Sequence, residues 1–217
     1  MGYALRSGLS YCMVDGHAVF LDLPADRYFQ LAERPEAVFK KLCSDGNLLS
    51  SELDMLPRPG FLEAASGADG LLPPMVLAPT TRSPAMKWDR PAVVSALAAV
   101  LIQRRFERSL TSRGLERTMI RLKLQKDRLP VVAKGGGVRD GWIRGFEQAK
   151  LLRSPVNRCL PRSMALASCL YRAGFGVQLV MGVRLRPFAA HCWVQDDATV
   201  LNDTPEEVAT FTPIFVL

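Results

Sequence analysis

A cysteine stands in the sequence at a position suited to nucleophilic chemistry. Cys159 lies in "SPVNRCLPRSMALAS", directly before an apolar run that predicts a helix ending near Ala173, with Gly174 as the stop. A thiol at a helix start lies close to the positive end of the helix dipole and to backbone N–H groups that have no intrahelical acceptor. Such settings lower a cysteine pKa from about 8.5 to roughly 3.5–7.5. The position therefore favours a reactive thiolate at Cys159.

A histidine and an aspartate follow in a pattern that predicts a hairpin. His191 lies in the expected strand "FAAHCWVQ". If residues 196–198 form the loop, Gln195 pairs with Thr199 and the same register sets His191 opposite Asp203. A carboxylate there would hold the ring in one tautomer and leave its other nitrogen to take a proton from a thiol.

Two alternatives stay open at this level. A two-residue loop would place Asn202 opposite His191 instead of Asp203. The second alternative is structural: the same three residues would then be a core cysteine, a hydrogen-bonded histidine and a loop aspartate, without any catalysis. The order of helix-start cysteine, strand histidine and hairpin aspartate favours a Cys159, His191 and Asp203 triad. We expect no metal and no cofactor, because the only histidines, His17 and His191, are far apart in the chain and the cysteines lack ligand spacing.

Composition indicates a folded protein outside the membrane. The chain has 217 residues and is 48% hydrophobic, enough for a core. It begins without a signal-peptide pattern, and its longest nearly apolar run, 92–102, is well short of the roughly 20 residues that a spanning helix needs. None of its five cysteines lies in a CxxC pair, so no disulfide framework is expected. We expect a cytoplasmic protein without membrane insertion.

Charge and proline content divide the sequence near residue 83. Residues 1–83 carry 7 Lys/Arg and 10 Asp/Glu, whereas residues 84–217 carry 21 and 11. Residues 57–84 hold six of the fifteen prolines, which indicates a connector. We expect one domain at 1–83, including most of this connector, and a second at 84–217.

Hydropathy patterns predict an α+β protein. Residues 8–31 have the pattern of three short strands, with turns at Asp15-Gly16 and at 24–26. In the second half, helices come first and an antiparallel sheet comes last. The expected helices are 32–46, 50–56, 89–110, 114–129, 139–153 and 160–173, and the expected later strands are 177–183, 188–195, 198–203 and 213–217.

The stretch 159–203 resembles a known family. "CLPRSMALAS", "GVRLRPFAAHCWV" and "LND" occur in the order found in the transglutaminase-like B proteins of lasso peptide biosynthesis. The resemblance implies a transglutaminase-like or papain-like cysteine peptidase domain, with Cys159 as nucleophile, His191 as base and Asp203 orienting the histidine. Residues 1–83 look like the winged-helix-like domain, a small three-stranded sheet plus helices, that recognises the precursor in some of these proteins.

The resemblance also implies a function. Such a hydrolase removes the leader from a ribosomally synthesised lasso peptide precursor and supplies the core peptide to an asparagine-synthetase-like cyclase that uses ATP. We expect any ATP requirement to belong to that partner, because this chain shows no nucleotide motif. In recognition domains of this type the leader adds as an extra strand at a sheet edge. The expected edge is "DRYFQL", which consists of Asp26, Arg27, Tyr28, Phe29, Gln30 and Leu31.

Other functions remain compatible with these residues. One is a thioester-forming acyltransferase of the same fold, in which an amine rather than water resolves the intermediate. Another is a non-catalytic module that binds the precursor for other enzymes. The basic helical stretch from Arg104 to Arg128 is the expected surface for the cyclase. It is accompanied by no zinc-finger, RNP-type or helix-turn-helix motif, so we expect no nucleic-acid partner.

Overall fold

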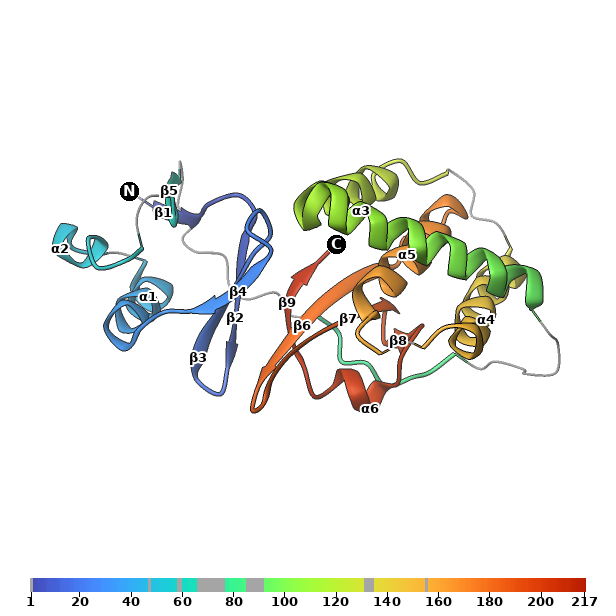
Figure 1. Ribbon diagram of the computed structural model, residues 1–217. Helices are drawn as coiled ribbons and strands as arrows, with labels where there is room; N and C mark the ends of the chain where they lie inside the picture. Colours follow the sequence, from blue (N-terminus) through green and yellow to red (C-terminus); the bar gives the residue numbers. More distant parts are fainter. Residues whose placement is uncertain are drawn as a thin grey trace. The chain divides into compact units, whose positions relative to one another are not determined.

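The computed structural model describes residues 2–46, 48–57, 60–65, 77–84, 92–130, 135–154 and 156–217. The chain divides into two compact units (Figure 1), one formed by residues 1–76 with 212–215 and the other by residues 77–211 with 216–217. The helix start expected at Asp89 and Pro91 lies outside the described residues, and so does part of the expected connector at 57–84. The α+β class is confirmed.

The first unit contains the expected three-stranded antiparallel sheet. Its strands are β2 (Leu9–Val14), β3 (His17–Asp22) and β4 (Arg27–Gln30), in the order β2-β3-β4. The turn between β2 and β3 is the predicted one, with positive φ values of 50° at Asp15 and 79° at Gly16. These values are those that a two-residue hairpin needs, and asparagine, aspartate and glycine tolerate them best. Because β3 is the central strand, β4 lies at one edge of this sheet and β2 at the other.

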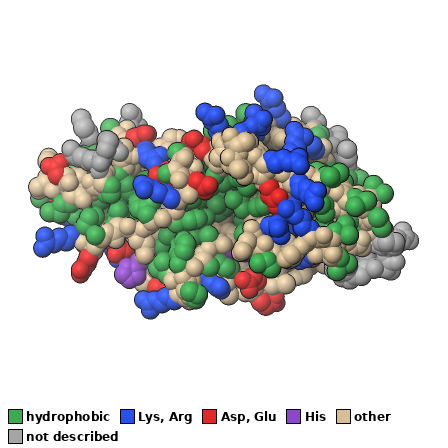
Figure 2. Space-filling view, in the orientation of Figure 1, with side chains coloured by type: hydrophobic (Ala, Val, Ile, Leu, Met, Phe, Trp, Pro, Cys, Tyr) green, Lys and Arg blue, Asp and Glu red, His purple; other side chains and the backbone are tan. Residues whose placement is uncertain are grey.

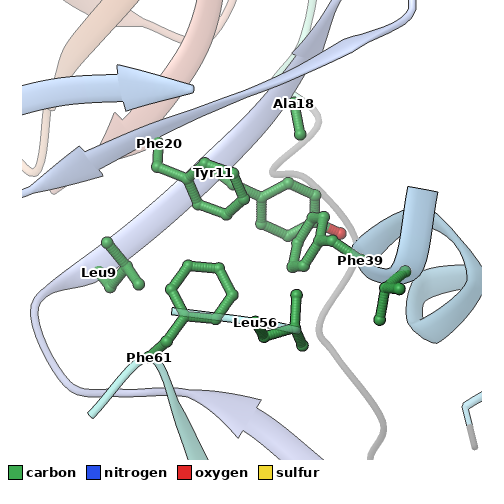
Figure 3. Packing of buried hydrophobic residues seen from close by; sticks show 8 residues of the cluster. Leu9, Tyr11, Ala18, Phe20, Phe39, Leu56 and Phe61 are labelled. Atoms are coloured by element: carbon green, nitrogen blue, oxygen red, sulfur yellow. The ribbon is translucent and has the colours of Figure 1, made fainter. Parts of the chain in front are cut away.

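Aromatic side chains form the core of the first unit (Figure 3). Phe20 lies at its centre and contacts the rings of Tyr11, Phe39 and Phe61 at centroid distances of 6.1, 4.9 and 5.3 Å. Phe39 comes from α1 (Glu33–Asp45), which is followed by the short α2 (Ser50–Leu53). The sequence did not predict that β1 (Gly2–Leu5) would pair with β5 (Leu62–Ala65), a strand inside the expected connector.

The second unit is built from helices and most of a four-stranded sheet, because residues 212–215 of the last strand are grouped with the first unit. The helices are α3 (Val93–Lys126), α4 (Gly136–Leu152), α5 (Cys159–Arg172) and α6 (Pro205–Val208). The strands are β6 (Gln178–Leu185), β7 (Phe188–Asp196), β8 (Thr199–Val200) and β9 (Thr212–Val216), in the order β8-β7-β6-β9.

Helix α5 is the central element of this unit. It packs on β6 and β7 on one side and on α3 and α4 on the other. Every residue from Pro161 to Tyr171 is buried as a consequence. A helix enclosed in this way has no polar face of its own. This enclosure explains the nearly continuous apolar run in its sequence.

The predicted register of the last hairpin is wrong by one residue. The structure pairs Gln195 with Val200 and Asp196 with Thr199, instead of Gln195 with Thr199. The loop is only Asp197 and Ala198, because Asp197 adopts a φ of 49° that allows the chain to reverse within two residues. The predicted strand 198–203 is also too long, since β8 ends at Val200.

The end of the expected connector belongs to the second unit. The N–H groups of Thr81 and Arg82 donate to the carbonyl of Ala198, and the N–H of Val200 donates to Arg82 at 3.0 Å. Arg82 therefore extends the sheet beside β8 as an isolated bridge to Thr199. No helix in the described part of the chain is both long and apolar enough to cross a membrane.

Helices α3 and α4 approach each other closely at Gly145, which gives a test of the packing. A Cβ added there would lie 2.5 Å from the Cβ of Ser95 and 2.9 Å from its carbonyl carbon. We expect Gly145→Ala to lower the free energy of unfolding by about 1–3 kcal/mol, the usual cost of overpacking.

Urea unfolding followed by circular dichroism measures this effect. Gly141→Ala on the same helix is the matched control, because its added Cβ meets nothing within 4 Å. This control should be neutral or stabilising, since alanine favours helices over glycine. Equal destabilisation by both substitutions would contradict the proposed contact.

Candidate active site

Cys159 occupies the first position of α5, so the helix begins one residue earlier than the sequence predicts. Pro161 is accommodated two residues later because the amides of a first helical turn have no intrahelical acceptor. The backbone N–H groups of Leu160 and Cys192 donate hydrogen bonds to the sulfur. The thiol is partly accessible. Its surroundings therefore combine a helix N-terminus with two amide donors.

His191 lies on β7 between Cys159 and Asp203. Its Nε2 is 2.7 Å from Oδ2 of Asp203, and its side chain also forms a hydrogen bond with Cys159. The side chains of His191 and Asp203 are 16% and 23% exposed, so the group is sheltered yet open to a substrate. The structure thus brings the three predicted residues together. Asp203 arrives from the bend after β8 instead of from a strand position opposite His191.

The contacts of these groups shift their pKa values in complementary directions. Burial disfavours the thiolate of Cys159, but its hydrogen bonds with His191 and the two amides outweigh burial and lower its pKa below 9.0. Burial also disfavours the imidazolium, yet the hydrogen bonds with Asp203 and Cys159 raise the pKa of His191 to about 9. The pKa of Asp203 is lowered despite its burial, chiefly by His191. These opposite shifts favour a thiolate and imidazolium pair over a thiol and a neutral imidazole.

Aromatic rings hold the imidazole in place. The ring of His191 stacks on Phe211 at 5.1 Å and on Trp193 at 6.1 Å. Gly182 lies opposite His191 in the β6 and β7 ladder, and a Cβ there would come within 2.8 Å of the Trp193 ring. Only glycine leaves room for this ring beneath the histidine.

A buried polar network connects the three segments that carry the site. The Asn202 side chain accepts from the N–H of Val194 and donates to Oγ of Ser163, both at 2.8 Å. The backbone carbonyl of Asn202 accepts from the guanidinium of Arg162 at 2.8 Å, and this arginine also pairs with Glu147. Sequence reasoning considered Asn202 only as an alternative partner for His191 and missed its role in this network. The signal for it was a polar residue directly before Asp203 and directly after the apolar Val200 and Leu201.

Other cysteines of the second unit have environments that disfavour reactivity. Burial raises the pKa of Cys169 to about 12. Burial also raises the pKa of Cys192 well above 9.0. Both side chains lie in the protein interior, as the alternation and helix patterns predict. Among these three cysteines, Cys159 alone has a lowered pKa.

The residues expected to bind a leader lie along β4 in the first unit. A hollow of about 420 Å³ runs beside this strand, and its lining includes Arg27, Phe29, Gln30 and Leu31. Asp26 lies in the preceding turn with a φ of 49°, and Tyr28 is not among the lining residues. The described residues contain no group of three or more His, Cys, Asp or Glu side chains arranged to hold a metal.

Comparison with known proteins agrees with this geometry. Residues 93–216, more than half of the chain, match the model of the transglutaminase-like superfamily. The chain is also 43% identical over 47 residues to the microcin J25-processing protein McjB of Escherichia coli. That match covers 22% of this chain and 23% of McjB, so the chain spans about a quarter of the length of this relative.

No solved structure gives a significant match. The superfamily match and the similarity to McjB both support the resemblance to lasso peptide B proteins. The superfamily match alone spans α3 to β9, and hence Cys159, His191 and Asp203. The chain therefore belongs to the transglutaminase-like superfamily.

Proposed function

We propose that this protein is a cysteine peptidase that removes the leader from a lasso peptide precursor in the cytoplasm. The observation that carries the proposal is the hydrogen-bonded series Cys159, His191 and Asp203 at the start of a buried helix. McjB is named for processing microcin J25, and its similarity to this chain supports the class of substrate. A cyclase that uses ATP is the proposed partner.

The reaction would proceed through a thioester. The Cys159 thiolate attacks the carbonyl carbon of the scissile peptide bond, and the resulting tetrahedral intermediate carries the negative charge on its oxygen. His191 donates its proton to the leaving amine, the C–N bond breaks, and an acyl-enzyme remains. His191 then takes a proton from water, whose oxygen attacks the thioester and releases the new carboxylate and the thiol.

The helix start supplies a donor for the developing oxyanion. As the first residue of α5, Cys159 has an N–H without an intrahelical acceptor. Preorganised N–H donors of this kind stabilise tetrahedral intermediates. The positive end of the helix dipole adds to the same effect. Cys159 would thus provide both the nucleophile and one oxyanion donor.

Leader recognition is proposed for the β4 edge. An edge strand presents unpaired backbone groups that an extended peptide can satisfy by adding as a further strand. The hollow beside β4 is lined by Leu9, Phe29, Leu31 and Phe61, which offer apolar surface, and by Arg27, which offers charge. Such a site would bind the backbone of the leader by hydrogen bonds and one or two of its apolar side chains by packing.

The first prediction about this function tests the nucleophile. Cys159→Ala should reduce cleavage of the precursor by about 10⁴-fold or more, because no other group can form the thioester. The measurement is mass spectrometry of precursor products, with and without the partner cyclase and ATP. Cys169→Ala on the same helix is the control and should still cleave, since its thiol is buried and unreactive.

The same assay separates the alternatives. A Cys159→Ala protein that cleaves normally would remove the proposed mechanism. Wild-type protein that binds the precursor and never cleaves it would indicate a binding module. A product in which an added amine replaces water at the new carboxyl end would indicate an acyltransferase.

The second prediction concerns pH. Cleavage requires a thiolate and an imidazolium, so kcat/KM should fall on the acid side as Cys159 is protonated, and on the alkaline side as His191 loses its proton near pH 9. In Asp203→Asn the imidazolium loses its carboxylate partner. The pKa of His191 should then drop, and the alkaline limb should move to lower pH.

A stopped-time cleavage assay from about pH 5 to about pH 11 measures this shift, because this range is wide enough to show both limbs of the pH profile. Glu206→Gln is the control, because it removes an exposed carboxylate three residues further on without touching the histidine. An alkaline limb that stays fixed in Asp203→Asn would show that Asp203 does not govern the protonation of His191.

The third prediction concerns the leader. Phe29→Ala should weaken binding of a synthetic leader peptide by about tenfold, because Phe29 lines the hollow beside β4. Met13→Ala is a matched control, since Met13 is also a partly buried residue packed against the same core but lies on β2. Fluorescence anisotropy of a labelled leader measures the affinity. Equal weakening by both substitutions would argue against the β4 edge.

A further inference from the structure

A second hollow lies in the second unit, away from Cys159. It has a volume of about 430 Å³, which is within the range of small-molecule sites. Its walls are the two arms of α3 and the later half of α5, represented by Ser168 and Arg172. Because Ser168 and Arg172 follow Cys159 by nine and thirteen residues, these walls of the hollow are about 13 Å and about 20 Å along the helix from the thiol. No step of the proposed cleavage uses it.

The bend of α3 creates this hollow. Gly114 has a non-helical φ of 79° and ψ of 171°, and it divides α3 into two arms, as the separate helices expected at 89–110 and 114–129 predict. Ser109 and Thr118 lie in different arms, yet their hydroxyl oxygens are 3.2 Å apart. In a straight helix nine residues span about 13 Å. The two arms therefore fold back and face each other.

Arginines dominate the lining of the hollow. Five of its residues are arginines, and no aspartate or glutamate lines it: Arg105, Arg108, Arg113, Arg121 and Arg172. They come from three helical segments, so the fold gathers charges that are distant in the sequence. Figure 2 shows Lys and Arg side chains gathered on this part of the surface, where Figure 1 places α3.

These arginines differ from others nearby in having no carboxylate partner. Arg153 and Arg158 both pair with Glu107, and Arg162 pairs with Glu147. Within the described part of the chain, none of the five lining arginines forms an ion pair. Like charges held around one hollow repel each other, and a bound anion would relieve that repulsion.

The remaining walls suit the rest of an organic anion. Ile102, Phe106 and Leu122 offer apolar surface. Polar groups are also present, and Oγ of Ser168 donates to Oε1 of Gln125 at 2.7 Å within the lining. A hollow with a few polar groups on an apolar wall is typical of small-ligand sites.

We propose that this hollow binds a small organic ligand that carries two or more phosphate groups. Guanidinium groups match phosphate oxygens with paired hydrogen bonds, and several converging arginines favour a multiply charged phosphate over a single carboxylate. The phosphates lie among the arginines, and the organic part lies on Ile102, Phe106 and Leu122. The outward Arg104 and Arg117, which do not line the hollow, remain available for the cyclase.

Isothermal titration calorimetry of the full chain at fixed ionic strength tests the proposal, with pyrophosphate and uridine diphosphate as probes. Pyrophosphate should bind with one-to-one stoichiometry, and Arg121→Gln and Arg172→Gln should each weaken it about tenfold. Arg117→Gln should leave the affinity unchanged. Uridine diphosphate should bind more tightly than pyrophosphate, and Phe106→Ala should remove only this difference.

Several results would overturn the proposal. One is the absence of saturable binding of either probe, and another is an equal loss in Arg117→Gln, which would indicate general attraction to a basic surface. A hexaglutamate peptide that binds more tightly than pyrophosphate would assign the hollow to an acidic protein segment. Citrate that binds as tightly as pyrophosphate would show that phosphate is not recognised. The arginines are exposed, so these variants should fold, and circular dichroism checks this.

Discussion

The geometry of the site depends on the buried side chain of Asn202. Its amide joins β7 through Val194 and α5 through Ser163, and it directly precedes Asp203 in the chain. Ser163 in turn donates to the carbonyl of Cys192 at 2.7 Å, beside His191. The helix that carries the thiol, the strand that carries the imidazole and the bend that carries the carboxylate are thus tied to one another by hydrogen bonds. Buried polar groups left without partners are costly, so this network specifies a single arrangement of the three segments.

Environment, and not residue type, determines which thiol of the second unit can react. Cys169 and Cys192 are buried and Cys159 is partly accessible, and burial by itself disfavours the thiolate of each. Cys159 differs because His191 and two backbone amides face its sulfur. The imidazolium is itself sustained by Asp203, so the charge on the sulfur depends on a carboxylate that does not touch it. Removing any one of the charges would leave the others buried with weaker compensation.

Much of this site was predictable because its parts are local signals. The helix after Cys159, its glycine stop and the alternating strand around His191 follow from patterns within about 15 residues, and each is present. The pairing of β7 with β8 was not predictable, since periodicity alone does not reveal that Asp197 adopts a positive φ and shortens the loop. The β1 and β5 pair and the Asn202 network depend on contacts between distant segments. Such contacts follow from packing, which sequence periodicity does not encode.

Helix α5 also explains how one compact unit can support two separate sites. Its first turn is the only part with free amides, and that is where a nucleophile gains from the dipole. Its middle is buried from Pro161 to Tyr171, and within this stretch only Ser168 lines the arginine-lined hollow. Only its last turn returns to the surface, where Arg172 meets the arms of α3 that Gly114 folds back. In an enclosed helix of this kind, functional side chains can therefore contact a substrate or ligand mainly at the two ends. The negative end of the dipole lies near Arg172 and stabilises its positive charge at this position.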